Sequence, residues 1–187
     1  PGARPKAYFQ AALHADETPP LLVAHHLLGD LIKADKEGRI KGEVIVVPMA
    51  NPLGLSQNLD GYHVGRHNLD GGGNFNRGFP DLGALVRDDL EGKLGVDPRT
   101  NIATIREALI YTVDNLPATT AHQALRKTLL AMAVDADIVL DLHCDLDALM
   151  HIYIGDALWP DASDLAADIG LLAVLLASDS GGGPFDE

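Results

Sequence analysis

The segment KAYFQAALHADE, residues 6–17, decides the fold class of the chain. Its first eight residues, 6–13, are apolar and predict a short buried strand. His14 and Glu17 follow that strand, three residues apart at a predicted strand-to-helix turn. Both residue types bind metal ions, and at this spacing both side chains can face one point. The segment therefore predicts a buried strand that ends at a candidate metal site.

Strands and helices alternate along the rest of the chain. A helix is predicted over residues 19–36, where two prolines suit the first turn and apolar residues recur at helical spacing. Further strands are predicted at residues 43–48, 138–142 and 151–154, and further helices at residues 100–116, 120–134 and 163–176. This alternation predicts an α/β layer fold, a mixed and largely parallel sheet flanked by helices.

Length and composition narrow the class of protein. The 187 residues predict one domain, since a domain usually has about 150. The 14 basic and 27 acidic residues give a net charge of −13, which argues against nucleic acid and against anionic membrane surfaces as partners. No apolar run is long enough to span a membrane. The one cysteine, Cys144, cannot form an internal disulfide, which fits a reducing compartment, so we expect a cytoplasmic protein.

A second histidine follows another predicted strand. The segment IVLDLH, residues 138–143, ends on His143. In parallel sheets ligands bind at the carboxyl ends of strands, so His143 is expected beside His14 and Glu17. Two imidazoles and one carboxylate form the ligand set of a catalytic zinc. The alternative is that His14 and Glu17 cap the following helix while His143 packs in the core.

The long segment between residues 51 and 80 holds the next candidates. It is rich in glycine and lacks clear periodicity, which is typical of functional loops, with disorder as the alternative. Asn76 and Arg77 lie side by side in NFNRGFP, and an arginine fork beside an amide suits a carboxylate. The alternative for Arg77 is a surface pair with Asp81 or Asp70. Arg66 is expected either to bind substrate and stabilise an oxyanion or to be solvated.

Four motifs in order resemble one protein family. They are H-x-x-E at residues 14–17, N-P-x-G at 51–54, N-x-N-R-x-F-P at 74–80 and D-L-H at 141–143. Together they are similar to the succinylglutamate desuccinylase/aspartoacylase group of the zinc carboxypeptidase-like (M14-type) superfamily. The resemblance covers nearly the whole chain and implies a zinc-carboxypeptidase-like fold.

The resemblance also implies roles for individual residues. His14, Glu17 and His143 match the ligands of one zinc ion per chain, and Asn76 and Arg77 match the pair that binds the substrate carboxylate. Arg66 is the best match to the arginine that polarises the scissile carbonyl, although its spacing to Asn76 is longer than the usual pattern.

The family's general base is a glutamate on a later strand, and no matching segment is present. Because the chain starts without methionine and stops after a glycine-rich stretch, we interpret residues 1–187 as a single zinc-hydrolase catalytic domain, the N-terminal portion of a longer protein that is C-terminally incomplete. Glu187 is not assigned as the base.

The expected function is zinc-dependent hydrolysis of an N-acyl amino acid or a similar small carboxylate-bearing amide by metal-activated water. The alternatives are a zinc metallocarboxypeptidase acting on peptides and a non-catalytic zinc- or carboxylate-binding module. The sequence leaves a homo-oligomer open. Asp141 is expected either to orient a ligand histidine or to end a strand, and His122 is expected on a helix surface.

Overall fold

The computed structural model describes residues 2–186 and is built around a three-stranded parallel sheet. The strand order is β2-β1-β7, with β1 at Lys6–Ala11, β2 at Glu43–Val47 and β7 at Ile138–Leu142. The central strand, β1, pairs in parallel with both neighbours. The expectation of a largely parallel sheet is confirmed, and it follows from helical crossovers between the strands.

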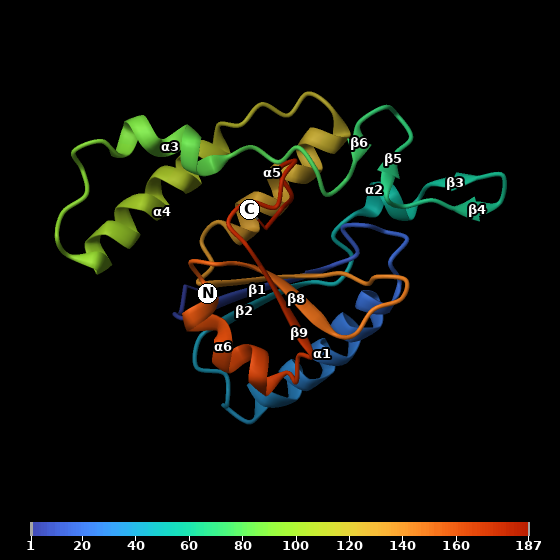
Figure 1. Ribbon diagram of the computed structural model, residues 1–187, viewed down its shortest axis with the longest axis horizontal. Coiled ribbons are helices and arrows are strands. Elements are labelled where there is room, and N and C mark those ends of the chain that lie inside the picture. The colour runs from blue at the N-terminus through green and yellow to red at the C-terminus, as the bar shows by residue number, and fades with distance from the viewer. Residues whose placement is uncertain (1, 187) are drawn as a thin grey trace.

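Helices lie on both sides of this sheet (Figure 1). Helix α1, Pro19–Lys36, packs against β1 and β2 from one side. Helix α5, Ala121–Ala133, lies on the other side, followed outward by α4, Pro98–Asp114, and α3, Leu82–Leu90. The predicted helix at residues 19–36 is thus confirmed at both ends, because paired prolines start it and Gly38 (φ 67°) follows its end.

Capping side chains define the starts of the helices beyond the sheet. Asp81 accepts a hydrogen bond from Ala84 N–H at the start of α3. Asp97 does the same for Thr100 N–H at the start of α4. Thr120 forms a reciprocal capping box with Gln123 at the start of α5. Helix α3 was not predicted from the sequence, although Asp81 supplies a usual N-cap signal.

The predicted helix over residues 163–176 is wrong. Helix α6 spans Trp159–Asp168, and Gly170 (φ 70°) ends it. The apolar residues that follow form β9, Ala173–Ala177, which pairs in parallel with β8, His151–Gly155. A short apolar run fits a buried strand as well as one side of a helix. The helical spacing of the apolar residues therefore predicted one helix where the structure has α6 followed by β9.

The segment between residues 51 and 80 is built from small ordered pieces. A single helical turn, α2 at Pro52–Leu55, is capped by the buried Asn51 side chain. Two short antiparallel pairs follow: β3 (Asn58–Leu59) with β4 (Tyr62–His63), and β5 (His67–Asn68) with β6 (Gly73–Asn74). Figure 1 shows these pieces beyond the end of the central sheet.

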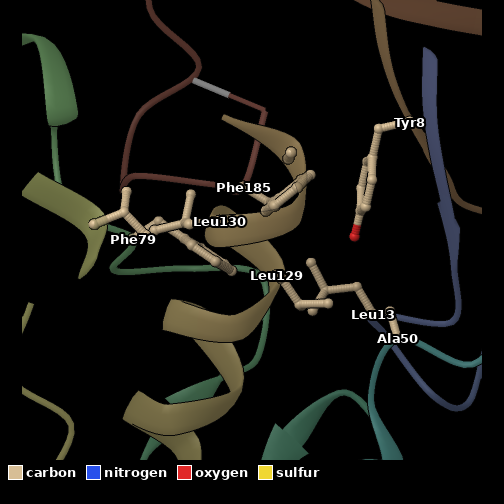
Figure 2. Close-up of a cluster of buried hydrophobic side chains, with 9 residues drawn as sticks. Tyr8, Leu13, Ala50, Phe79, Leu129, Leu130 and Phe185 are labelled. Carbon is tan, nitrogen blue, oxygen red and sulfur yellow. The ribbon is translucent and has the colours of Figure 1, made fainter. Parts of the chain in front are cut away.

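A hydrophobic core fills the space between the sheet and α5. Figure 2 shows Tyr8 from β1 pointing toward Leu129 of α5, with Phe79 and Phe185 beside the same helix. The ring of Phe185 lies 6.1 Å from that of Tyr8 and 5.4 Å from that of Phe79. The C-terminal segment of the described chain is therefore part of the core. Among residues 2–186, no helix has the length and apolarity to cross a membrane.

Ion pairs join the start of β1 to the turn before β7. Arg4 and Lys6 both pair with Asp135, and the Lys6 N–H donates to Asp137 Oδ2 at 2.7 Å. Arg106 of α4 pairs with the other oxygen of Asp137. Although burial raises the pKa of Asp137, its bonds to Lys6 N–H, Arg106 and Arg4 outweigh burial and lower that pKa to about 2.

Replacing Asp137 with asparagine should lower the free energy of unfolding at neutral pH by about 1 kcal/mol, since exposed pairs are screened. The folded pKa lies below the unfolded value of about 3.9. The carboxylate therefore stabilises the fold above about pH 4, and the contribution is lost as pH falls toward 2. Urea unfolding of both proteins at about pH 7 and about pH 2 measures this. A stability difference as large at about pH 2 as at neutral pH would contradict it.

Candidate metal centre and substrate site

The first two candidate ligands lie in the turn that follows β1. Ala12, with φ 62°, redirects the chain after the strand, and the Glu17 N–H donates to the His14 carbonyl at 3.0 Å. His14 is 5% exposed and Glu17 is 8% exposed. The N-cap of α1 is Thr18, with no side-chain hydrogen bond. His14 and Glu17 therefore do not cap this helix, and the capping alternative is wrong.

The third candidate arrives from the neighbouring strand. Ala11 pairs with Leu142 in the β1–β7 register, so His143 emerges beside the turn that carries His14. Ligand atoms of His14, Glu17 and His143 all lie within 4.8 Å of one another. His14 Nδ1 is 2.9 Å from Glu17 Oε1, and His143 Nδ1 is 3.0 Å from Glu17 Oε2. The structure thus brings the three candidate ligands into one group.

The outer nitrogen of each imidazole is held by an acceptor. His14 Nε2 lies 2.8 Å from Asn74 Oδ1, which also accepts the Asn76 N–H and so is identified as the oxygen. His143 Nε2 lies 2.8 Å from Asp141 Oδ2. Each Nε2 therefore carries the proton, which leaves the Nδ1 lone pairs directed at Glu17. Asp141 orients His143, and Asn74 has a role that the sequence analysis missed.

The charges at this site favour a cation among the three ligands. Two nitrogen lone pairs facing a carboxylate repel it unless a proton or a metal ion lies between them. Burial lowers the pKa of His143, but bonds to Asp141 and Glu17 outweigh it and raise that pKa to about 10. Burial raises the pKa of Glu17, but bonds from His14, His143 and the Cys144 N–H hold it well below its usual value. The donor set therefore fits a divalent metal.

Arg66 contacts two members of the ligand group directly. Its Nη2 donates to Glu17 Oε1 at 2.5 Å, and its Nη1 donates to His14 Nδ1 at 3.2 Å. The side chain remains 43% exposed, so one side of the guanidinium faces solvent. Gly65 makes this approach possible, because a Cβ there would lie 2.3 Å from Asp16 N. Arg66 therefore lies against the candidate ligands on their solvent-facing side.

Asn76 and Arg77 occupy different positions relative to the ligands. Asn76 is 7% exposed; its Oδ1 accepts the Phe185 N–H at 2.8 Å, and its Nδ2 lies 3.4 Å from His143 Nε2. Arg77 is exposed and donates from Nη1 to the Asn76 carbonyl at 2.6 Å. Within the described chain Arg77 forms no ion pair with Asp81 or Asp70. Asn76 thus belongs to the ligand cluster, and Arg77 lies at its solvent side.

Three further polar side chains, those of Gln57, Cys144 and His122, are directed away from this cluster. The Gln57 side chain holds the loop by donating to the carbonyls of Val64 and His67. The Cys144 Sγ points to the Asp145 carbonyl, while its N–H bonds Glu17. The expectation that His122 lies on the surface is wrong. It is buried, because its ring packs 4.9 Å from that of Phe75 in the loop that covers α5.

Comparisons with known proteins point to one family. Residues 3–92 match the model of the succinylglutamate desuccinylase/aspartoacylase catalytic domain. The whole chain superposes on a succinylglutamate desuccinylase/aspartoacylase family protein from Shewanella amazonensis, with TM-score 0.76 and 29% identity. The chain is thus similar to the succinylglutamate desuccinylase/aspartoacylase family in sequence over residues 3–92 and in fold over its whole length. A protein of Shewanella frigidimarina described in the same terms gives TM-score 0.71 and 26% identity.

The desuccinylase/aspartoacylase likeness covers only part of those proteins. All of this chain aligns, but it spans 50% of the first Shewanella chain and 49% of the second. No curated protein matches the chain. Glu187, which the sequence analysis left without a role, lies outside the described residues.

Proposed function

We propose that residues 1–187 form a single catalytic domain of a zinc-dependent deacylase, the N-terminal portion of a longer protein, which hydrolyses N-acyl amino acids or similar small carboxylate-bearing amides. One observation carries the proposal: the Nδ1 atoms of both ligand histidines converge on Glu17, while their Nε2 atoms are bonded to the side-chain oxygens of Asn74 and Asp141. Anchoring of this kind is typical of metal-binding histidines. The cytoplasm is the proposed location.

His14, Glu17 and His143 would hold one zinc ion through two nitrogens and a carboxylate. When bound, zinc would act as a Lewis acid and lower the pKa of a water molecule toward about 7. Three protein ligands leave a coordination position for that water. Asn74 and Asp141 keep both imidazoles in the tautomer that presents Nδ1 inward.

The remaining residues bind and orient the substrate. Arg66 is proposed to donate hydrogen bonds to the scissile carbonyl oxygen as negative charge develops there. Asn76 and Arg77 are proposed to bind the substrate carboxylate, and binding at two points orients the amide toward the metal. A general-base glutamate would take the proton from the water and deliver it to the leaving amine. We place that glutamate beyond residue 187.

The first test is the metal content of the purified chain, measured by elemental analysis with H14A, H143A and H25A beside it. We expect about one zinc per chain in the unsubstituted protein and a loss of zinc in H14A and H143A. H25A is the matched control because His25 is an exposed histidine on α1 whose ring lies edge-on to that of His26. A folded chain that stays free of metal when zinc is supplied would refute the ligand assignment.

The second test is turnover of the zinc-loaded protein in its longer form. Hydrolysis of N-acyl amino acids, with little turnover of peptides, is the expected result. Preference for peptides would make the protein a carboxypeptidase. Zinc binding without turnover of either substrate would make it a binding module. Each outcome assigns the metal site to a different function.

A further inference from the structure

The carboxylate-binding segment, residues 76–79, is held from two sides. On one side lies the C-terminal strap, residues 182–185, which pairs with it along the backbone. The Gly78 N–H donates to the Gly182 carbonyl and the Phe79 N–H to the Gly183 carbonyl, both at 2.9 Å. The Phe185 N–H donates to Asn76 Oδ1, which directs the amide nitrogen of Asn76 toward the ligand cluster.

On the other side lies a single residue of α5. Arg126 Nη2 donates to the Arg77 carbonyl at 2.5 Å, and its guanidinium lies 5.6 Å from the centre of the Phe79 ring. It also borders Gly78, where an added Cβ would lie 3.4 Å from Arg126 Nη2. Gly78 has φ 69°, a conformation that glycine adopts without strain. The peptide between Arg77 and Gly78 is therefore held at its N–H by the Gly182 carbonyl and at its carbonyl by Arg126.

The surroundings of Arg126 do not include a counter-charge. Among residues 2–186 no carboxylate forms an ion pair with it, and its Nε is buried without a hydrogen-bond partner. Burial lowers the pKa of its side chain. Placing a guanidinium in such surroundings costs free energy. In this position the Arg126 guanidinium donates a hydrogen bond to the Arg77 carbonyl.

We infer that Arg126 is a positioning residue that fixes the peptide after Arg77 and thereby orients Asn76 and Arg77 toward the carboxylate of the substrate. This inference rests on the proposed function. Without Arg126, this peptide keeps its N–H bond to Gly182 but loses the donor to its carbonyl, and it can tilt because glycine tolerates a wide range of φ. The Arg77 carbonyl would then lose its direction, although the strap still bonds Asn76, Gly78 and Phe79.

The kinetic test compares R126M, R126K and K127M in the zinc-loaded, full-length protein. For an N-acyl amino acid we expect R126M to raise KM about tenfold with kcat changed less than about twofold. R126K should recover part of the loss, since lysine can donate to the same carbonyl. A substrate whose free carboxylate is esterified should show little change in KM. An equal loss for both substrates, or a fall in kcat alone, would overturn the inference.

K127M is the matched control on the same helix. Lys127 also donates to carbonyls, those of Asp114 and Leu116, at the end of α4. Its loss should lower stability without changing KM. A rise in KM in K127M equal to that in R126M would show that the effect is one of general stability, which would overturn the inference.

Hydrogen exchange separates this inference from the proposed function. In R126M the amides of Gly78 and Phe79 should exchange faster than in the unsubstituted protein, with α1 unchanged; in K127M they should not. If the unsubstituted protein hydrolyses no amide, the proposed function fails, while this exchange pattern still supports positioning. Unchanged exchange at Gly78 and Phe79 in R126M would overturn the inference whatever the activity.

Discussion

Replacing Arg66 with methionine should lower kcat for amide hydrolysis by roughly 10²–10³-fold while zinc stays bound. The guanidinium donates to Glu17 and to His14 Nδ1, so it lies against the ligands and still faces solvent. A donor at this point stabilises an oxyanion, and its loss is felt in the transition state more than in substrate binding. Glu17 keeps His14, His143 and the Cys144 N–H as partners, so the metal site persists.

The measurement is kcat, KM and bound zinc for R66M, R66K and R39M. R39M is the control because Arg39 is also exposed and paired with a glutamate, Glu37, but lies beyond the end of α1. R66K should retain part of the activity, since an ammonium supplies a donor without the fork. A kcat for R66M equal to that of R39M would show that Arg66 takes no part in the reaction.

The parallel sheet and α1 could be predicted because their signals are local. Residues 6–13 are apolar, paired prolines begin α1, and Gly38 follows its end. The three ligands could be proposed for the same reason, since each follows a strand that the pattern marks as buried. Residues 163–176 show the limit of such signals, because helical spacing continues across Gly170, although that glycine is a stop signal and does end α6.

The surroundings of the ligands could not be predicted, because they depend on contacts between distant residues. Asn76 is oriented by Phe185, 109 positions later. His122 is buried by the packing of Phe75, and the pattern of α5 alone placed it on the surface. One feature of the sequence pointed to Asn74 as a site residue, namely its place at the start of the N-x-N-R motif. Its bond to His14 depends on the β5–β6 pair, which no periodicity marks.

Replacing Phe185 with alanine should lower the free energy of unfolding by about 3–5 kcal/mol, the usual cost of truncating a buried phenylalanine. The ring is 6% exposed and packs against Tyr8 and Phe79, so alanine would leave a cavity between the sheet and α5. Urea unfolding of F185A and F185L measures the cost. The leucine variant should lose less, since it fills more of the same space.

The same substitution should also affect substrate binding, since the ring anchors the strap that orients Asn76. The Phe185 N–H is a backbone group and survives the substitution, but the ring contacts with Tyr8 and Phe79 that help to hold it against Asn76 Oδ1 are lost. KM for the carboxylate-bearing substrate should therefore rise in F185A. L129A, another core truncation, should lose comparable stability without this rise, because Leu129 is not part of the strap. Equal KM values in F185A and L129A would show that the strap contributes to stability and not to the orientation of Asn76.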